Sequence, residues 1–411
     1  MTAIEQNSAI VIKTLAEAKE VLRMKEMRQG LYDVGAVVMA DVLVNLHGEA
    51  HRNRRRLENR LFRRETLQHY ERDLFPGVIK ETLAPYIAQG SAELVSFSHQ
   101  MMMNLAALNA GVDRRDHTAE ETHRLYGYMM KFIEAATMAH STGDRDQLNR
   151  EVQEALHRFD EEFLQPSIAR RTELIERNAR GEVEDSEVPS DVLMILLRNE
   201  DHLQISDDTI LREIAFFLLA GAHTSATSFT RTIHHIFEWI ELHPEDRGLV
   251  RSDRTFVQRC VLETVRLNPS SPVTVRRALE DVTLQSGEVI HAGDTAVIDL
   301  IAVNRDTNLY GADAQTFNPR RELADGVTPY GLSFGHGMHA CIGQELATGR
   351  ESADADGQHE YGLIATAVQA MFDAGVEPDP EQSPVIDSHT ARPYWSDYSV
   401  VFNRSRRTDR A

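Results

Sequence analysis

Three observations predict a mainly α-helical fold with a small β region for this chain of 411 residues. Residues 66–180 are mostly of helical character, with interruptions expected at Pro76-Gly77, Gly90-Ser91, Gly111 and Ser141-Thr-Gly-Asp144. A second long helical pattern follows Ser206, a suitable N-cap residue, and continues to about Leu242. In contrast, residues 282–300 have the pattern of short strands, with a turn at Gly293.

Composition narrows the class of protein. Apolar residues make up 42% and charged residues 26% of the chain, as in ordinary globular proteins. The net charge of −20 argues against a general nucleic-acid partner. The longest apolar run, Ile214–Ala222, is shorter than the about 20 residues that cross a bilayer. No signal-peptide pattern starts the chain, and two cysteines form no disulfide framework. We therefore expect a cytoplasmic protein without a membrane partner.

The N-terminal part of the chain predicts one strand and one helix. Residues 9–13 have the pattern of a strand, and Thr14 is a plausible cap for a helix from Leu15 to Met27. The following stretch, residues 30–48, is apolar but irregular in period. It is either plain core or a surface that contacts a ligand.

An arginine-rich helix is predicted next. Residues 51–64 contain seven arginines, in a chain that is otherwise acidic. His51 and Arg55 are four residues apart, so that both side chains leave one helix face. The stretch is either a solvated helix face or a docking surface for an acidic partner.

Two further helices carry patterns of polar or small residues. The predicted core helix contains Ala220-Gly221-Ala222-His223-Thr224, where small side chains allow a close approach of another group. Without further context, His223 on this helix is interpreted as a satisfied core histidine. On the next helix, Glu263 and Arg266 are three residues apart and able to pair.

The most specific stretch is residues 332–347, which contain Cys341. Gly335, Gly337 and Gly343 flank this cysteine, and a helical pattern follows it. A cysteine at a helix N-terminus favours the thiolate, which is a good axial ligand for haem iron. Two alternatives remain: a buried structural cysteine, which we expect for Cys260, and a zinc site that starts from His336, His339 and Cys341.

The pattern Phe334-x-x-Gly337-x-His339-x-Cys341-x-Gly343 resembles the haem-binding signature of the cytochrome P-450 superfamily. The Ala-Gly-x-x-Thr, Glu-x-x-Arg and Phe-Asn-Pro-x-Arg motifs occur in the order that this family has. The resemblance implies a single cytochrome P-450 domain over residues 1–411, with haem b between a long distal helix and the cysteine loop. It also implies that a leading helix and a first strand of the family are missing here.

The resemblance assigns roles to individual residues. Cys341 would be the axial ligand of the haem iron, and Glu263, Arg266 and Arg321 would form a structural network. Thr224, with His223, Ala220 and Gly221, would form the catalytic site for dioxygen and protons. The residues that would contact haem are His51, Arg55, Arg276, Phe334, Gly337, His339, Cys341 and Gly343, with Arg277 a competitor of Arg276.

Two departures from the family pattern stand out. The family usually has an acidic residue where this chain has His223, which questions the usual proton delivery. In addition, residues 349–362 are polar and acidic where the helix behind the haem should continue. We expect that helix to be broken or shifted.

The resemblance implies a haem-thiolate monooxygenase of secondary metabolism that oxidises a small to mid-sized apolar substrate with O2. No flavin or iron–sulfur motif occurs, so a separate ferredoxin and its reductase would supply two electrons, with docking near Arg52, Arg54, Arg56 and Arg60. The alternatives are a reaction other than hydroxylation, such as oxidative coupling, and a non-catalytic haem-binding sensor.

Overall fold

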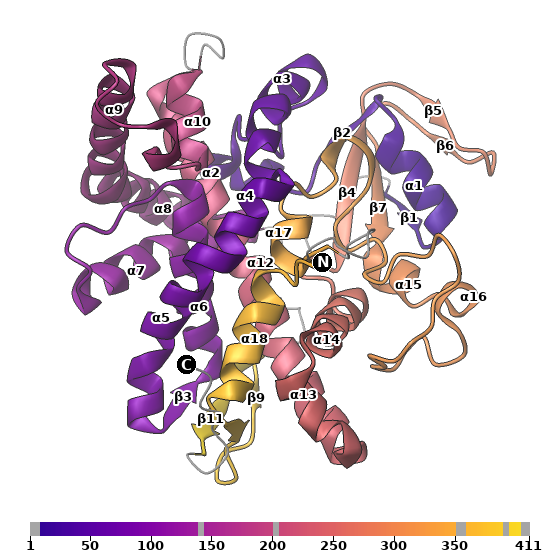
Figure 1. The fold of residues 1–411 in the computed structure, drawn as a ribbon. Helices are drawn as coiled ribbons and strands as arrows, with labels where there is room; N and C mark the ends of the chain where they lie inside the picture. The colour runs from indigo at the N-terminus through magenta and orange to yellow at the C-terminus, as the bar shows by residue number, and fades with distance from the viewer. Residues whose placement is uncertain (1–8, 139–143, 200–204, 351–358, 389–393, 404–411) are drawn as a thin grey trace. The chain divides into compact units, whose positions relative to one another are not determined.

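The computed structural model describes residues 9–138, 144–199, 205–350, 359–388 and 394–403 (Figure 1). The chain forms two compact units. The first unit contains Gln29–Thr66 and Met102–His223, and the second contains Leu67–Met101 together with the described residues before Gln29 and after His223. Both units are thus built from segments that are distant in the sequence. A single domain over residues 1–411 stays a prediction.

The first unit is helical. Its helices are α2 (Ala36–Met39), α3 (Gly48–Glu58), α7 (Ala119–Ala136), α8 (Arg145–Phe159), α9 (Gln165–Ala179) and α10 (Val192–Arg198). Apolar side chains hold α7 against α8, and the rings of Phe132 and Phe159 meet edge to face at 5.4 Å between centroids. The N-caps follow the sequence: the Thr118 hydroxyl accepts the Glu121 N–H, and the Asp144 carboxylate accepts two N–H groups of the first turn of α8.

The second unit combines helices with strands of each of the four small sheets that the described residues form. Its helices are α1 (Leu15–Arg23), α5 (Phe75–Gln89), α13 (Leu249–Ser252), α14 (Arg254–Leu267), α15 (Leu300–Asn304), α16 (Thr307–Tyr310), α17 (Gln344–Thr348) and α18 (Leu363–Asp373). Three helices have residues in both units: α4 (Arg64–His69), α6 (Leu94–Ala110) and the 36-residue α12 (Asp207–Leu242). Ser206 accepts the Thr209 N–H at the start of α12, as predicted.

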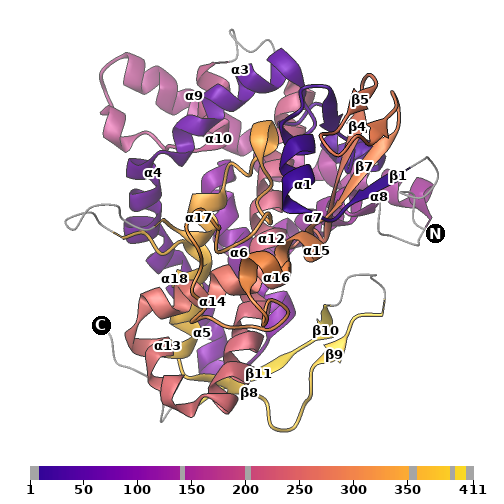
Figure 2. The same ribbon diagram turned by 90° about the vertical axis from the view of Figure 1, so that its right-hand side faces the viewer.

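The largest sheet has the strand order β1-β7-β4-β2, and Figure 2 labels β1, β7 and β4 of this sheet. Its strands are β1 (Ala9–Ile12), β7 (Thr295–Asp299), β4 (Val273–Ala278) and β2 (Met27–Gln29). β1 pairs in parallel with β7, whereas β4 pairs with β7 in antiparallel orientation. The other strands are β3 (Ser91–Glu93), β5 (Val282–Thr283), β6 (Val289–Ile290), β8 (Val376–Pro378), β9 (Val385–Ile386), β10 (Trp395–Asp397) and β11 (Ser399–Phe402).

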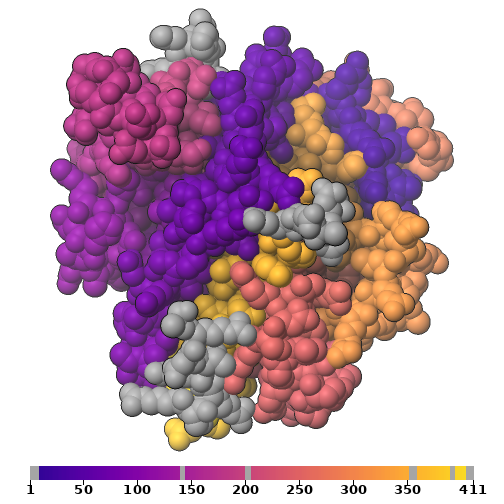
Figure 3. Space-filling view, viewed as in Figure 1, coloured from indigo at the N-terminus to yellow at the C-terminus, as the bar shows by residue number. Residues whose placement is uncertain are grey.

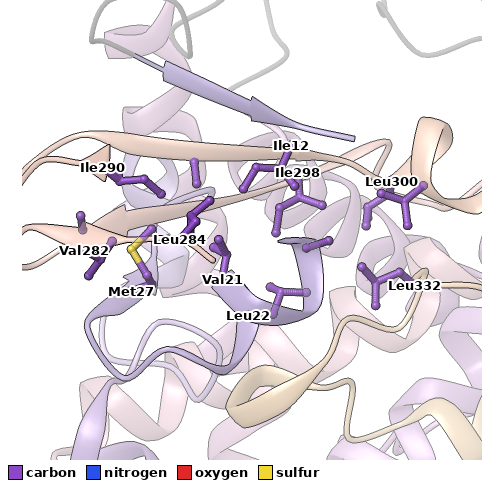
Figure 4. Close-up of a cluster of buried hydrophobic side chains, with 14 residues drawn as sticks. Ile12, Val21, Leu22, Met27, Val282, Leu284, Ile290, Ile298, Leu300 and Leu332 are labelled. Carbon is purple, nitrogen blue, oxygen red and sulfur yellow. The ribbon is translucent and has the colours of Figure 1, made fainter. Parts of the chain in front are cut away.

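An apolar core joins α1 to this sheet (Figure 4). Val21 and Leu22 of α1 pack with Ile298 of β7 and with Leu332, which starts the cysteine loop. Because burial of apolar surface is the main stabilising term, this core fixes where the cysteine loop begins.

The fold class predicted from the sequence is confirmed: helices dominate and the strands are few and short. Two boundaries were wrong. The first helix ends at Arg23 rather than Met27, because Met24 is extended and Met27 pairs in β2. Pro76 does not break a helix but lies in the first turn of α5, where its missing N–H costs nothing.

No helix in the described ranges combines the length and apolarity needed to cross a membrane.

Candidate functional site

The cysteine loop is closed by one backbone hydrogen bond. The N–H of Cys341 donates to the carbonyl oxygen of Phe334 at 2.8 Å. Gly337 has a φ of +69°, and a Cβ there would collide with the carbonyl oxygen of Leu22 in α1. Only glycine combines this backbone conformation with so close an approach. The packing of the loop against α1 therefore explains why a glycine is required at position 337, four residues before Cys341.

The two cysteines differ in environment. Cys260 is completely buried in α14, and burial raises the pKa of its thiol well above the usual value. Cys341 is exposed, and three half-buried apolar residues flank it: Phe334, Ile342 and Leu346. A soft sulfur ligand beside accessible apolar side chains fits a flat apolar group with an iron centre. The helix that follows, α17, has only five residues.

The zinc alternative has no support in the geometry. The Nε2 atom of His336 accepts a hydrogen bond from Nε of Arg23 at 2.7 Å. Burial, and then the nearby Arg23, lower the pKa of His336, consistent with a neutral accepting ring. Across the described ranges, no three His, Cys, Asp or Glu residues form a group that could hold a metal ion.

Glu263, Arg266 and Arg321 meet in one buried network. Both oxygens of the Glu263 carboxylate accept from Arg266 at 2.7 Å, and Oε1 also accepts from Nε and Nη2 of Arg321 at 3.1 Å. Arg266 extends further, because its Nη1 donates to the carbonyl oxygens of Asn304 and Ala314 at 2.7 and 2.9 Å. Bidentate pairs of this kind satisfy buried charges. The sequence had named all three members.

The start of the cysteine segment is attached to α14 through two polar side chains. The Asn304 amide donates to the carbonyl oxygen of Arg266 at 3.0 Å, and its oxygen accepts the Leu332 N–H at 2.7 Å. The Ser333 hydroxyl donates to the carbonyl oxygen of Val265 at 2.8 Å. Neither of these two contacts was predicted from the sequence.

The central part of α12 has an accessible side. Ala220, Gly221 and His223 are half-buried, and Thr224 is exposed. In contrast, Ala222 and Ser225 of the same stretch are buried. An accessible stripe in the middle of a core helix indicates that this side faces space rather than packed side chains. The structure therefore brings the four predicted residues to a surface where a ligand could reach them.

The carbonyl oxygen of Thr224 accepts three hydroxyl groups. The donors are Thr227 at 2.9 Å, Ser228 at 2.9 Å and Ser270, in the loop after α14, at 3.1 Å. Hydroxyl donors that compete for a helix carbonyl tend to bend the helix locally. Neither Ser270 nor its role was anticipated from the sequence.

The arginine-rich helix α3 has a buried and an exposed side. His51 is buried, and burial followed by the charge of Arg55 lowers its pKa to about 4, so that at neutral pH it is an uncharged donor. Arg55 Nε donates to Asn59 at 3.0 Å. Arg276 of the second unit donates to the Thr274 hydroxyl and the Val275 carbonyl oxygen at 3.1 and 3.0 Å.

The predicted docking surface needs one correction. Arg54 is only 6% exposed and pairs with Glu213 at 2.5 Å, so it cannot meet a partner protein. The prediction was wrong at this position because a helix of arginines has no sequence signal for which side turns inward. Arg52, Arg56 and Arg60 are exposed. Part of the surface of α3, which contains Arg52 and Arg56, is visible in Figure 3.

Beside Arg54 lie two buried carboxyl groups. Glu213 accepts the Leu43 N–H as well as the Arg54 guanidinium, while both oxygens of Glu58 are buried without a partner in the described part of the chain. Burial, and then the charge of Glu213, raise the pKa of Glu58 well above its usual value. Burial also raises the pKa of Glu213, to about 7, although the Arg54 guanidinium and the Leu43 N–H oppose that rise. Because Glu58 has no such donors within the described residues, Glu58 is the carboxyl group that holds its proton more strongly.

The segment behind the cysteine loop departs from a continuous helix, as the sequence indicated. α17 ends at Thr348, and α18 begins only at Leu363. Residues 351–358, which contain several of the acidic residues of this stretch, lie outside the described residues.

Comparison with known proteins agrees with this site. A sequence model of the family cytochrome P-450 matches residues 4–350, which contain α12, α14 and the cysteine loop. The chain belongs to the cytochrome P-450 family. It is therefore a haem-thiolate oxidoreductase whose class uses haem iron, O2 and redox partners.

Among curated relatives, pulcherriminic acid synthase of Bacillus subtilis is 28% identical over 325 residues, with 76% of this chain and 71% of the relative covered. The vitamin D(3) 25-hydroxylase of Pseudonocardia autotrophica is 29% identical over 177 residues, with 43% of this chain and 40% of the relative covered. The crystal structure of CalO2 superposes with a TM-score of 0.72 at 18% identity, covering 98% of this chain and 92% of that chain. At this identity the structural similarity shows the fold alone.

Proposed function

We propose that this protein is a monooxygenase that hydroxylates or otherwise oxidises a small to mid-sized apolar substrate, with haem b ligated by Cys341. The observation that carries the proposal is the exposed Cys341 thiol on a loop closed by the Cys341–Phe334 hydrogen bond, beside accessible apolar side chains. The buried Cys260 offers no such ligand.

We propose that residues of several elements would contact the cofactor. When bound, haem supplies the activation of dioxygen, and thiolate ligation favours cleavage of its O–O bond. The family resemblance suggests that the propionates would accept hydrogen bonds from His51, Arg55, Arg276 and His339. Phe334, Gly337 and Gly343 would shape the surface beneath the ring.

Residues of α12 would organise the side where substrate binds. The Thr224 hydroxyl would donate to dioxygen or hold a water that delivers protons, and His223 lies directly before it. Ala220 and Gly221 keep this side of the helix free of bulky side chains. The half-buried Phe216, one turn before Ala220, adds apolar surface that suits an apolar substrate.

The relatives support a place in secondary metabolism. Pulcherriminic acid synthase, by its name, makes a small organic acid, and the coverage of both chains is extensive. We propose that the substrate here is likewise a small organic metabolite rather than a macromolecule.

We also propose that an acidic ferredoxin docks on the exposed side of α3 and the turn after it. Arg52, Arg56 and Arg60 are exposed there, in a chain whose net charge is −20. A local basic surface on an acidic protein steers an acidic partner to one place.

The absorption spectrum of the reduced protein with carbon monoxide tests the central proposal. We expect the strongly red-shifted Soret band of thiolate-ligated haem in the wild type and in Cys260→Ser, and its loss in Cys341→Ser. Cys260→Ser is the matched control, because it removes the other thiol. A red-shifted band that survives Cys341→Ser would contradict the proposal, as would a wild type that binds haem without this band.

One specific observation favours a second candidate function, an oxidation other than hydroxylation. His223 stands before Thr224 in the accessible stripe of α12, and a histidine relays protons differently from a carboxylate because its protonated form is cationic. Slow or misdirected proton delivery would favour reactions such as oxidative coupling over oxygen insertion. A third possibility, a sensor without turnover, predicts no substrate-dependent consumption of NAD(P)H.

A further inference from the structure

One helix, α14, is attached to both ends of the segment that carries Cys341. At the start of the segment, the carbonyl oxygen of Val265 accepts from Ser333, and the carbonyl oxygen of Arg266 accepts from Asn304, which in turn accepts the Leu332 N–H. These contacts come from the C-terminal end of α14. They fix the chain nine residues before Cys341.

The other attachment comes from Gln258, in the first half of α14. Its amide nitrogen donates to the carbonyl oxygen of Thr348 at 2.8 Å and to that of Glu360 at 3.0 Å. Its amide oxygen lies 2.6 Å from Nε2 of His359, so that this ring nitrogen is the donor. Gln258 is 3% exposed, and its side chain makes two buried hydrogen bonds and one partly buried hydrogen bond. Sequence reasoning had given this residue no role.

These bonds are needed because α17 cannot continue. Gly349 has a φ of +78°, and a Cβ there would collide with the carbonyl oxygen of Glu360. A helix that stops leaves its last carbonyl groups without N–H donors. The Gln258 amide provides a donor for the last of these carbonyls, that of Thr348.

Residues 348–350 and residues 359–362 lie side by side, and we call this pair of segments the neck. Arg350 and Glu360 exchange backbone hydrogen bonds of 2.8 and 3.2 Å. The Glu71 carboxylate accepts the Tyr361 and Gly362 N–H groups at 3.1 and 2.9 Å, at the start of α18. Gln258 binds both segments of the neck, through the carbonyl oxygens of Thr348 and Glu360. It therefore fixes the end of α17 relative to α14.

We propose that Gln258 is a positioning residue that orients the Cys341 sulfur through α17. This inference rests on the proposed haem ligation by Cys341. α17 begins three residues after Cys341 and has only about one and a half turns, which move as a rigid unit. A shift of α17 at Thr348 therefore also moves its first residue, Gln344, and with it the nearby Cys341. If α17 continued beyond Thr348, its additional turns would hold it in place. Because α17 stops there, the hydrogen bonds of Gln258 hold its end instead.

The experiment compares Gln258→Leu with a matched control, Gln369→Leu. Gln369, on α18 of the same unit, is 6% exposed. Within the described residues its amide nitrogen donates to the carbonyl oxygens of Val250 and Arg251, at 2.9 and 3.3 Å, and to Asp373, and none of these residues belongs to the cysteine segment. Both variants remove a buried amide that binds backbone carbonyls. Thermal unfolding and the carbon monoxide spectrum of the reduced haem protein are measured for each.

We expect both variants to lower the melting temperature, whereas only Gln258→Leu lowers the fraction of haem with the red-shifted, thiolate-type band, by about twofold or more. Gln258→Glu is the second variant, for the case that Gln258→Leu does not fold. It keeps the shape but replaces the donor by an oxygen, and we expect the same spectral loss.

Two results would overturn the inference. One is a wild-type thiolate fraction in Gln258→Leu or Gln258→Glu. The other is an equal spectral loss in Gln369→Leu, which would mean that the effect follows stability alone. Failure of the proposed function gives a different result, because then the wild type itself would bind haem without the red-shifted band.

Discussion

Glu58 and Glu213 are two buried carboxyl groups beside one arginine, and their protonation should make stability depend on pH. Burial and the charge of Glu213 raise the pKa of Glu58 well above its usual value of 4.5. Above pH 4.5 the unfolded chain loses a proton that the folded protein keeps. The stabilisation is therefore complete at low pH and is lost as the pH rises toward the raised folded-state pKa.

We predict that Glu58→Gln flattens the decline in stability between pH 5 and pH 8 and raises the free energy of unfolding at pH 8 by about 1 kcal/mol or more. Glutamine has nearly the same shape and never ionises. Urea denaturation across this pH range measures the effect. Glu65→Gln, on an exposed position, is the control and should leave the slope unchanged. Parallel curves for Glu58→Gln and the wild type would contradict the assignment.

His223 allows a second prediction at the scale of one residue. If the histidine weakens proton delivery to the Thr224 side of α12, His223→Asp should raise the fraction of consumed NADPH that yields oxidised product. The measurement is the ratio of hydrogen peroxide released to NADPH oxidised, with a surrogate ferredoxin and its reductase, in the presence of a compound that shifts the haem spectrum. An increased peroxide ratio in His223→Asp would favour the alternative that this histidine serves another oxidation.

Among the elements, α14 has the largest number of functions. It provides Glu263 and Arg266 for the buried network, and its backbone and Gln258 hold the cysteine segment at two places. Its buried face makes these contacts, while Arg259 on the opposite face is exposed. The contacts of α14 thus stabilise the cysteine segment together with the packing of the loop against α1.

At this scale we predict that Arg321→Leu lowers the free energy of unfolding by about 3–5 kcal/mol, because it leaves part of the buried Glu263 charge uncompensated. The Arg321 side chain is 6% exposed. We expect haem incorporation, measured as the ratio of Soret to protein absorbance, to fall with it. Arg259→Leu is the control on the exposed side of α14 and should stay within about 0.5 kcal/mol of the wild type. A similar decrease in the free energy of unfolding in both variants would contradict the prediction that the Glu263, Arg266 and Arg321 network stabilises the fold.

The whole molecule is strongly acidic, with a net charge of −20, yet exposed arginines gather on α3 and the following turn. We predict that reversing three of them, in Arg52→Glu/Arg56→Glu/Arg60→Glu, slows reduction of the haem protein by an acidic ferredoxin about tenfold or more at low salt. Stopped-flow absorbance measures the rate, and raising the ionic strength should reduce the difference between variant and wild type.

The matched control changes the total charge equally at exposed arginines of other helices and loops: Arg145→Glu/Arg247→Glu/Arg259→Glu. We expect this variant to be reduced at nearly the wild-type rate. Equal slowing of both triple variants would show a general charge effect, and an unchanged rate in the first variant would rule out docking at α3.

Much of the fold and of the candidate site could be predicted from the sequence, because the signals are local. Helical periodicity and the Ser206 cap predicted α12, and the residue spacing around Cys341, together with the order of four motifs, indicated the family before any geometry was known. The Glu263, Arg266 and Arg321 network was predicted by the same resemblance. Each of these features depends on residues that are adjacent or on a motif that is short.

Other features depended on tertiary structure. The burial of Arg54 beside Glu213, the contact of Gln258 with Thr348 and the close approach of Gly337 to Leu22 join residues that are far apart in the chain. The approach of other segments decides that Arg54, among several arginines of α3, turns inward. It also decides that Gln258 binds the end of α17, where a further helical turn is missing. Such long-range contacts have no pattern in a single sequence, because an identical residue is exposed or buried according to what packs against it.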